Sequence, residues 1–185
     1  MIKIFSTIVL SLIIAIKVMA YEEANYEVVK QNKVYEIRKY SDRLAVEIIT
    51  SNQGSSFRKL FNYISGNNEN KEEISMTTPV TQIEKKGSMT MQFYLPSKFN
   101  KNNTPSPSNS DVKILNIKGG YYAVIKYSGR ASDKNFIKHK DILKSELKKN
   151  DILILSSPIK ATYDKPFTLP ILRRNEAMFK IDINL

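Results

Sequence analysis

Six segments of the sequence alternate polar with apolar residues or run through β-branched and aromatic residues, and this pattern constrains the fold most. The segments are 34–40, 43–50, 88–95, 112–117, 121–127 and 177–183. Successive side chains of a strand point to opposite faces, so an alternating strand has one buried face and one solvated face. Such half-buried strands are typical of antiparallel sheets. The chain is therefore predicted to build most of its core on an antiparallel sheet.

Two other segments carry the period of an α-helix. The segments are 54–65, which Gly66 follows as a stop signal, and 133–149, which Ser132 precedes as an N-cap. Asp133 and the pair Lys148–Lys149 favour the positive and negative ends of the second helix. The apolar residues at helical spacing are Phe57, Leu60, Phe61 and Ile64 in the first segment and Phe136, Leu143 and Leu147 in the second.

The order of these elements is strand, strand, helix, strand, strand, and the same order follows again. The polar, proline-containing segment 97–111 joins the halves and is predicted to be a loop. Lys86-Gly87 and Gly119-Gly120 are predicted to form hairpin turns. We predict an α+β fold, in which two pseudo-repeated ββαββ units form an antiparallel barrel-like sheet and two helices pack outside it.

Residues 1–20 have the layout of a secretory signal peptide. Lys3 provides the basic start, residues 4–16 are apolar, and the segment ends in small residues at Ala20. The apolar stretch is shorter than the roughly 20 residues that a membrane-spanning helix needs. We expect cleavage after Ala20, a single domain over 21–185, a secreted or periplasmic location, and no stable membrane insertion afterwards. An uncleaved anchor remains the alternative.

Composition narrows the chemistry that is open to the chain. It has no cysteine and one histidine, so disulfides, zinc–thiolate sites, cysteine nucleophiles and two-histidine metal sites are excluded. Its net charge is +11, and removal of the two lysines of the leader leaves +9. That charge favours an anionic partner, although a solvated lysine-rich surface would give the same count. Without an arginine-rich run or a pattern of RNA-binding aromatics, nucleic acid is not expected as a partner.

Few residues stand out as catalytic or metal-binding candidates. His139 could ligate iron or act as a base, but the alternative is a border histidine of the second helix, because no partner lies at helical spacing. Four methionines could offer thioethers to an iron or simply fill the core. They are Met76, Met89, Met91 and Met178. Glycine-rich nucleotide-binding motifs are absent. We predict no metal site and no enzyme.

An apolar surface flanked by positive charge is the strongest candidate for a binding site. A groove of this kind suits a small hydrophobic anion with a flat ring and carboxylates. The alternative is that the helix face is ordinary core. The first helix contributes Phe57, Leu60, Phe61 and Ile64 beside Arg58 and Lys59, and the loop near the carboxyl end contributes Phe167, Leu169, Ile171 and Leu172 beside Arg173.

The adjacent residues Arg173 and Arg174 must point to opposite faces if they lie on a strand. Arg174 shares a face with Glu176, so these two can pair with each other and brace the strand. Arg173 is the better candidate for a ligand carboxylate. A structural role for both arginines remains the favoured interpretation.

Three blocks of sequence carry a resemblance to a known family. They are YEVVKQNKVYEIRKY at 26–40, FRKLFNYISGNNENKEEISMTTPV at 57–80 and PFTLPILRRNE at 166–176. With these blocks the chain resembles the SOUL haem-binding family from about Tyr26 to Ile183. The resemblance implies a distorted antiparallel β-barrel with two helices, and binding of haem or a related tetrapyrrole between the first helix and the loop before the Arg-Arg-Asn-Glu strand.

The chain departs from the family at several positions. Some members place a histidine, proposed as the axial ligand of the iron, where this chain has Lys39, so the resemblance implies binding without a histidine ligand. Basic residues proposed for the haem propionates in a haem-binding member fall at uncharged residues. Those residues are Gly54, Asn62 and Leu169 here, so Arg58, Lys59 or Arg173 would have to substitute.

Three functions therefore remain open. The first is a monomeric secreted or periplasmic carrier or buffer of haem. The second is a non-haem module of GyrI-like architecture that binds another small molecule or a protein partner. The third, an enzyme acting on a tetrapyrrole or amphiphile, is the weakest because no acid–base residue is singled out.

Overall fold

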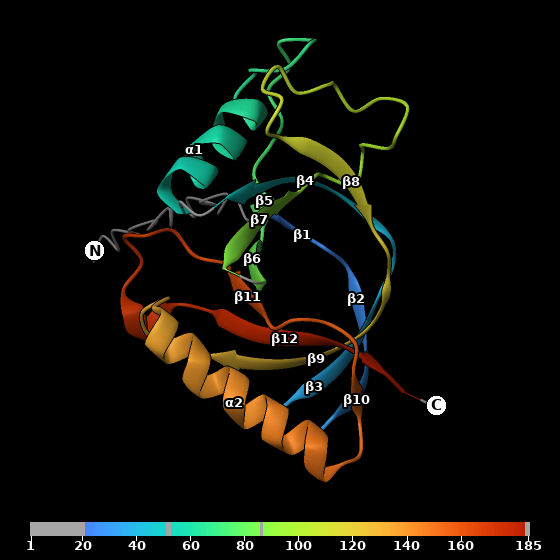
Figure 1. Cartoon of the computed structure of the whole chain (residues 1–185), viewed down its shortest axis with the longest axis vertical. Coiled ribbons are helices and arrows are strands. Elements are labelled where there is room, and N and C mark those ends of the chain that lie inside the picture. Colours follow the sequence, from blue (N-terminus) through green and yellow to red (C-terminus); the bar gives the residue numbers. More distant parts are fainter. Residues whose placement is uncertain (1–20, 51–52, 86, 184–185) are drawn as a thin grey trace, which may run out of the picture.

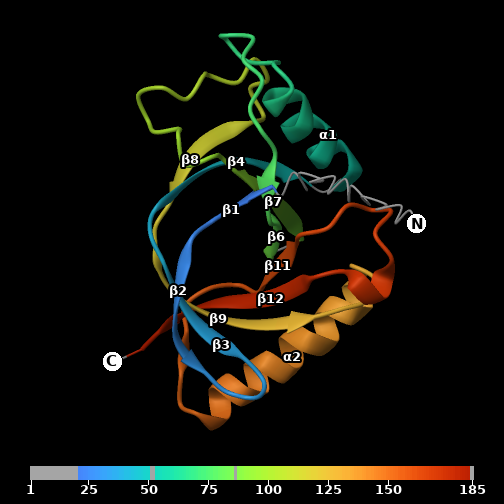
Figure 2. The ribbon, with the colours of Figure 1, turned by 180° about the vertical axis from the view of Figure 1, so that it is seen from behind.

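The computed structural model describes residues 21–50, 53–85 and 87–183, which form an α+β fold. One antiparallel sheet curls into a distorted barrel, and the helices α1 (Gln53–Ile64) and α2 (Asp133–Lys149) pack on its outside (Figures 1 and 2). The strands lie in the order β2 (Tyr26–Gln31), β3 (Glu36–Tyr40), β9 (Gly120–Tyr127), β12 (Asn175–Asp182), β11 (Ile159–Thr162), β6 (Val80–Lys85), β7 (Ser88–Tyr94), β4 (Arg43–Thr50) and β8 (Lys113–Ile117).

Shorter elements complete the architecture. Strand β10 (Leu153–Ile154) pairs with β12, and β1 (Glu22–Glu23) forms a parallel pair with β5 (Thr77–Thr78). A 3₁₀ helix, η1 (Pro170–Leu172), lies in the segment before β12. No helix among the described residues is both long enough and apolar enough to cross a membrane.

The predicted α+β fold is confirmed. All six alternating segments contain strands, and both helical segments are helices. Strands β1, β2, β5, β6, β10 and β11 lie outside the predicted segments. Strand β11 has only four residues, too few to establish a period, and it becomes a strand because β6 and β12 flank it on both sides.

One predicted hairpin is correct and the other is wrong. Strands β6 and β7 form a hairpin in which Lys85 pairs with Ser88, and Gly87 adopts φ +77°; Lys86 itself lies outside the described residues. Gly119-Gly120 is not a hairpin turn, because β8 pairs with β4 whereas β9 pairs with β3 and β12. These glycines lie where the chain crosses from one half of the sheet to the other.

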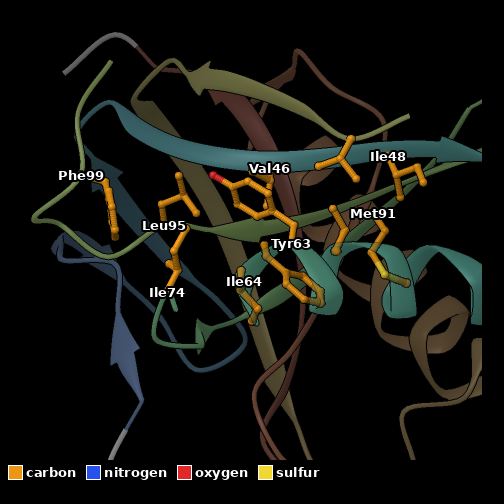
Figure 3. Packing of buried hydrophobic residues seen from close by; sticks show 11 residues of the cluster. Val46, Ile48, Tyr63, Ile64, Ile74, Met91, Leu95 and Phe99 are labelled. Carbon is orange, nitrogen blue, oxygen red and sulfur yellow. The ribbon is translucent and has the colours of Figure 1, made fainter. Parts of the chain in front are cut away.

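Each helix covers its own half of the sheet with a separate hydrophobic cluster. Leu60 and Ile64 of α1 pack on strands β4 and β7, together with the residues of Figure 3. Leu143 and Leu147 of α2 pack on β9 and β12. A third cluster lies between the halves and includes Tyr40 and Met178.

The helix ends follow local rules. The Ser132 hydroxyl accepts a hydrogen bond from the Asn135 N–H at 3.3 Å and so caps α2, as predicted. Gly66 follows α1 with φ +98°, a conformation that glycine adopts without a Cβ penalty. The predicted loop 97–111 contains no strand or helix.

Candidate functional site: a pocket between helix α1 and the tail loop

A pocket of about 380 Å³ opens between α1 and the segment 163–174, which we call the tail loop. The two elements face each other on one side of the molecule (Figure 1). Strands β6 and β11 supply part of the remaining wall. The lining residues are Tyr21, Phe57, Phe61, Met76, Thr78, Val80, Gln82, Ala131, Lys160, Thr162, Tyr163, Asp164, Lys165, Pro166, Arg173 and Asn175.

Phe57 and Phe61 form the aromatic wall of the pocket. They lie one turn apart on α1, their rings stack at 6.1 Å between centroids, and they remain 43% and 47% exposed. Phe57 also contacts the buried ring of Phe93 edge-on at 5.2 Å. The sheet thus supports an apolar surface that is open to solvent.

The other apolar residues predicted on α1 do not line this pocket. Leu60 and Ile64 are buried in the core cluster on β4 and β7. The alternative interpretation of the helix face as core therefore holds for these two residues. A helix presents residues over a broad arc, so one stripe can serve both the core and the pocket.

The basic residues predicted on α1 also point elsewhere. Neither Arg58 nor Lys59 lines the pocket, and the Lys59 ammonium pairs with Asp111 at 2.7 Å. Arg173 does line it, but its guanidinium donates to the carbonyl oxygens of Thr168, at 2.7 Å, and Pro166. Arg173 therefore holds the tail loop in shape.

The predicted apolar residues of the tail loop form its outer surface. They are absent from the pocket wall and are highly exposed. Phe167 is 81% exposed, Leu169 65%, Ile171 77% and Leu172 69%. Whether any of the residues predicted at this site binds a ligand stays a prediction.

Lys165 is a pocket cation that the sequence reasoning missed. It is exposed, and its ammonium lies 5.3 Å from the ring centroid of Tyr21 and 5.8 Å from that of Phe167. No described acidic residue forms an ion pair with it. Its charge is therefore available to a ligand, and its position directly before the quoted block 166–176 could have pointed to it.

A second lysine lies deeper in the pocket. Lys160 of β11 is 6% exposed, and its ammonium donates to Asp133 at the start of α2 at 2.9 Å.

Val80 and Gln82 alternate with Thr81 along β6 and face the pocket. A period-two reading of β6 would have found both residues.

Arg174 belongs to an ion network that fixes β12. It forms two hydrogen bonds to Glu23, at 2.8 and 2.9 Å, and one to Glu176 at 2.9 Å. The fully buried Glu176 also receives two hydrogen bonds of 3.0 Å from Arg38. The predicted pairing of Arg174 with Glu176 is confirmed, and Glu23 is a further member of the network.

Two groups in this network have shifted pKa values. Burial raises the pKa of the Tyr163 hydroxyl far above its ordinary value, and the charge of Glu176 raises it further. Burial alone would lower the pKa of Arg174, but the hydrogen bond to Glu23 and the charge of Glu176 outweigh it and raise that pKa. Tyr163 is therefore protonated and Arg174 charged at neutral pH.

Potential iron ligands are sparse around the pocket. His139 lies on α2, where its ring stacks on Tyr127 at 4.1 Å and its Nδ1 lies 2.8 Å from the Asn135 carbonyl oxygen. Among the methionines, Met76 lines the pocket, whereas Met91 and Met178 are core residues. The described residues contain no group of three or more His, Cys, Asp or Glu side chains that could hold a metal ion.

A family model described as SOUL heme-binding protein matches residues 21–180. The crystal structure of the EcmrR C-terminal domain superposes with a TM-score of 0.60 at 13% identity and covers 85% of this chain and 98% of that one. A hydrolase from Listeria innocua superposes with a TM-score of 0.57 at 8% identity and covers 83% and 94%. At such identities the likeness extends to the fold alone. No curated protein matches the sequence.

Proposed function

Because the chain belongs to the SOUL heme-binding protein family, we propose that the pocket between α1 and the tail loop binds haem or a related tetrapyrrole. The protein would act as a carrier or buffer and perform no chemistry on the ligand. The observation that carries this proposal is an open aromatic wall, Phe57 and Phe61, in the same pocket as Lys165, a cation that forms no ion pair with any described residue.

The apolar residues of the pocket suit a flat ring. Phe57, Phe61, Met76 and Val80 line it, and burying their surface against a ring removes apolar area from water. The volume of about 380 Å³ lies near the lower end of the range for small-molecule sites, roughly 300–1,000 Å³. We infer that the pocket encloses part of the ring and that the rest lies against the rim.

The charges of the rim suit carboxylates. Lys165 is the best-placed cation, and Lys160 adds positive charge deeper in the pocket while it bonds Asp133. These residues take the place that Arg58 and Lys59 held in the sequence-based prediction. A carboxylate on a ring stacked against Phe57 and Phe61 would gain a charge-assisted hydrogen bond from Lys165.

The pocket also limits how a haem iron could be held. Its described lining residues include no histidine, and among them Met76 provides a thioether as a soft donor. Bound haem would supply an iron able to bind a further ligand or exchange an electron. The residues of the chain bind and orient the ring by apolar contact and charge, which supports the histidine-free mode.

We propose binding rather than catalysis because the acidic groups near the pocket are engaged. Asp133 bonds Lys160, the Asp164 carboxylate accepts the Arg174 backbone N–H at 2.6 Å, and Glu176 is enclosed by two arginines. The Tyr163 hydroxyl donates a hydrogen bond to the Glu176 carboxylate at 2.7 Å. Each of these groups is already hydrogen-bonded, so none is free to act as an acid or base on a ligand in the pocket.

A location outside the cytoplasm completes the proposal. It is supported by the layout of residues 1–20, which lie outside the described part of the chain, and by the expected charge of +9 after the loss of two leader lysines from +11. A protein that stores an anionic tetrapyrrole would attract that ligand through such a positive field.

Titration of haem into the purified protein tests the proposal. We expect a saturable Soret shift at micromolar haem. Phe61→Ala should weaken binding roughly tenfold, because it removes an apolar contact from the wall. Ile49→Ala is the matched control, since Ile49 is 60% exposed and does not line the pocket. No saturable shift, or equal effects of the two variants, would contradict the proposal.

A non-haem ligand is the second candidate, favoured by the lack of histidine in the lining. A thermal-shift screen of flat amphiphilic anions distinguishes the two. Stabilisation by another amphiphile that Phe61→Ala abolishes, with haem inert, would support this candidate.

A further inference from the structure

The tail loop presents four large apolar side chains to solvent. Phe167, Leu169, Ile171 and Leu172, which we call the docking face, are 65–81% exposed and do not line the pocket. Exposed apolar groups that lie together on a folded surface mark sites that another apolar phase covers. The pocket itself gives no reason for their exposure.

The docking face is held in shape by backbone contacts beneath it. Arg173 binds the carbonyl oxygens of Thr168 and Pro166, and the Pro170 carbonyl accepts the Gly129 N–H at 2.8 Å. The loop backbone is thus anchored from both sides while the apolar side chains point outward. Such a preformed loop loses little conformational entropy when it is covered.

Three cations lie on segments next to the docking face. Lys165 belongs to the tail loop, Arg130 directly follows Gly129, whose N–H donates to Pro170, and Lys134 lies in the first turn of α2. All three are exposed and have no ion pair with any described residue. The nearby acids are already engaged, Asp133 by Lys160 and Asp164 by the Arg174 N–H. The local charge is therefore complementary to an anionic surface.

The chain enters the domain at the same place. Tyr21, the first described residue, lines the pocket and contacts Lys165, whose ammonium lies 5.3 Å from the tyrosine ring centroid. The first described residue of the domain therefore lies beside the tail loop.

We propose that the docking face binds the surface of an anionic lipid bilayer. Phe167, Leu169, Ile171 and Leu172 enter the headgroup–acyl boundary, and Lys165, Arg130 and Lys134 contact the anionic headgroups. This activity goes beyond tetrapyrrole binding and does not depend on it. It places the pocket rim beside the lipid, where amphiphilic ligands concentrate.

The protein has no tryptophan, so a single introduced indole reports on this contact. In the full chain we would compare Ile171→Trp with Leu153→Trp, because Leu153 is 61% exposed and its strand β10 lies away from the tail loop (Figure 1). With vesicles of phosphatidylcholine and phosphatidylglycerol, the indole of Ile171→Trp should shift to the blue and be quenched by brominated acyl chains. The indole of Leu153→Trp should do neither.

Polar substitution measures how strongly the docking face contributes to vesicle binding. Ile171→Ser with Leu172→Ser should weaken vesicle partitioning roughly tenfold or more, since two apolar side chains lose their lipid contact. Leu153→Ser with Leu155→Ser is the matched control, because Leu155 is 54% exposed and also lies outside the pocket. Pure phosphatidylcholine should bind roughly tenfold more weakly than the anionic mixture.

Three outcomes would overturn the proposal. One is vesicle binding of the full chain without any shift of the Ile171→Trp indole, which would assign binding to residues 1–20. Another is equal loss of partitioning in both double-serine variants. The third is a dimer, seen in sedimentation, that the Ile171→Ser and Leu172→Ser variant abolishes while its vesicle partitioning stays unchanged. The docking face would then be covered by a second copy of the chain. Phe61→Ala, which should weaken haem binding, should leave vesicle partitioning unchanged, and this separates the proposal from the pocket because Phe61 lies outside the docking face.

Discussion

Arg174 and Glu176 are two residues apart in the sequence, and this spacing was enough to predict their ion pair. The other partners of the network are remote, because Arg38 lies 138 residues from Glu176 and Glu23 lies 151 residues from Arg174. Arg173 points away from this network and binds loop carbonyl oxygens instead. At the scale of the residue, the adjacent arginines therefore have separate structural roles.

Removing the charge of Glu176 should be costly. Glu176→Gln removes the fully buried counter-charge of Arg38 and leaves Glu36 as the remaining ion-pair partner of Arg38 in the described chain, so we expect the free energy of unfolding to fall by about 3–5 kcal/mol. Urea denaturation measures this change. Glu69→Gln, at an exposed residue without an ion pair to the described chain, should change it by less than about 0.5 kcal/mol. Equal effects would mean that the network contributes nothing.

The element with the most divided role is α1. Its residues Leu60 and Ile64 belong to the core, whereas Phe57 and Phe61 form the pocket wall. The helical period predicted the apolar stripe but could not tell its core residues from its pocket residues. That distinction depends on where β4, β7 and the tail loop lie around the helix. The same limit applies to the connection between β8 and β9, whose glycines resemble a hairpin turn in sequence.

Gly119 is required in that connection by close approach. An added Cβ would lie 2.4 Å from the Tyr40 carbonyl oxygen, which is backbone and cannot rotate away. We expect Gly119→Ala to lower the free energy of unfolding by about 1–3 kcal/mol. At Gly87 an added Cβ meets nothing within 4 Å, and only the positive φ of +77° opposes it, so Gly87→Ala should cost roughly 1 kcal/mol. Urea titration of both variants checks this order; a larger loss at Gly87 would contradict it.

The two halves of the whole molecule meet where Asp42 lies. Its carboxylate accepts hydrogen bonds from Lys118, from the Gly119 N–H and from Asn116, which join the β3–β4 turn to the β8–β9 connection. The hydrogen bond from Lys118 is the largest of these effects, and together they hold the pKa of Asp42 well below its usual range. The charge of Asp42 therefore makes the stability of the folded sheet depend on pH.

This depressed pKa predicts acid sensitivity of the fold. The ionised Asp42 stabilises the folded protein above the unfolded pKa of about 3.9, and its contribution is lost as the pH falls through the lower folded pKa. Glu36 acts in the same direction, because hydrogen bonds from Lys126 and Arg38 outweigh the effect of burial and lower its pKa. The free energy of unfolding should therefore decline below about pH 4.

Urea denaturation at pH 7, 4 and 3 measures this decline. Asp42→Asn should be less stable than the unsubstituted protein at pH 7 and should lose less stability on acidification. Asp182→Asn is the control, since Asp182 is exposed and has no ion pair with the described chain. A decline in Asp42→Asn equal to that of the unsubstituted protein would show that this carboxylate does not contribute.

The sequence by itself determined the α+β class, the positions of both helices, six strand segments and the pairing of Arg174 with Glu176. These features depend on residues that are close along the chain, where period, caps and i, i+2 spacing are directly visible. The family resemblance also came from local blocks, and the match over residues 21–180 confirms it.

Only the tertiary structure decided which residues meet across the molecule. It paired β8 with β4, buried Leu60 and Ile64, brought Lys165 beside Tyr21, and left the docking face exposed. The physical reason is that burial and ion pairing depend on neighbours distant in sequence, whose positions follow from how the curled sheet brings its strands together. A local pattern fixes which side chains can share a face, and the fold decides what that face contacts.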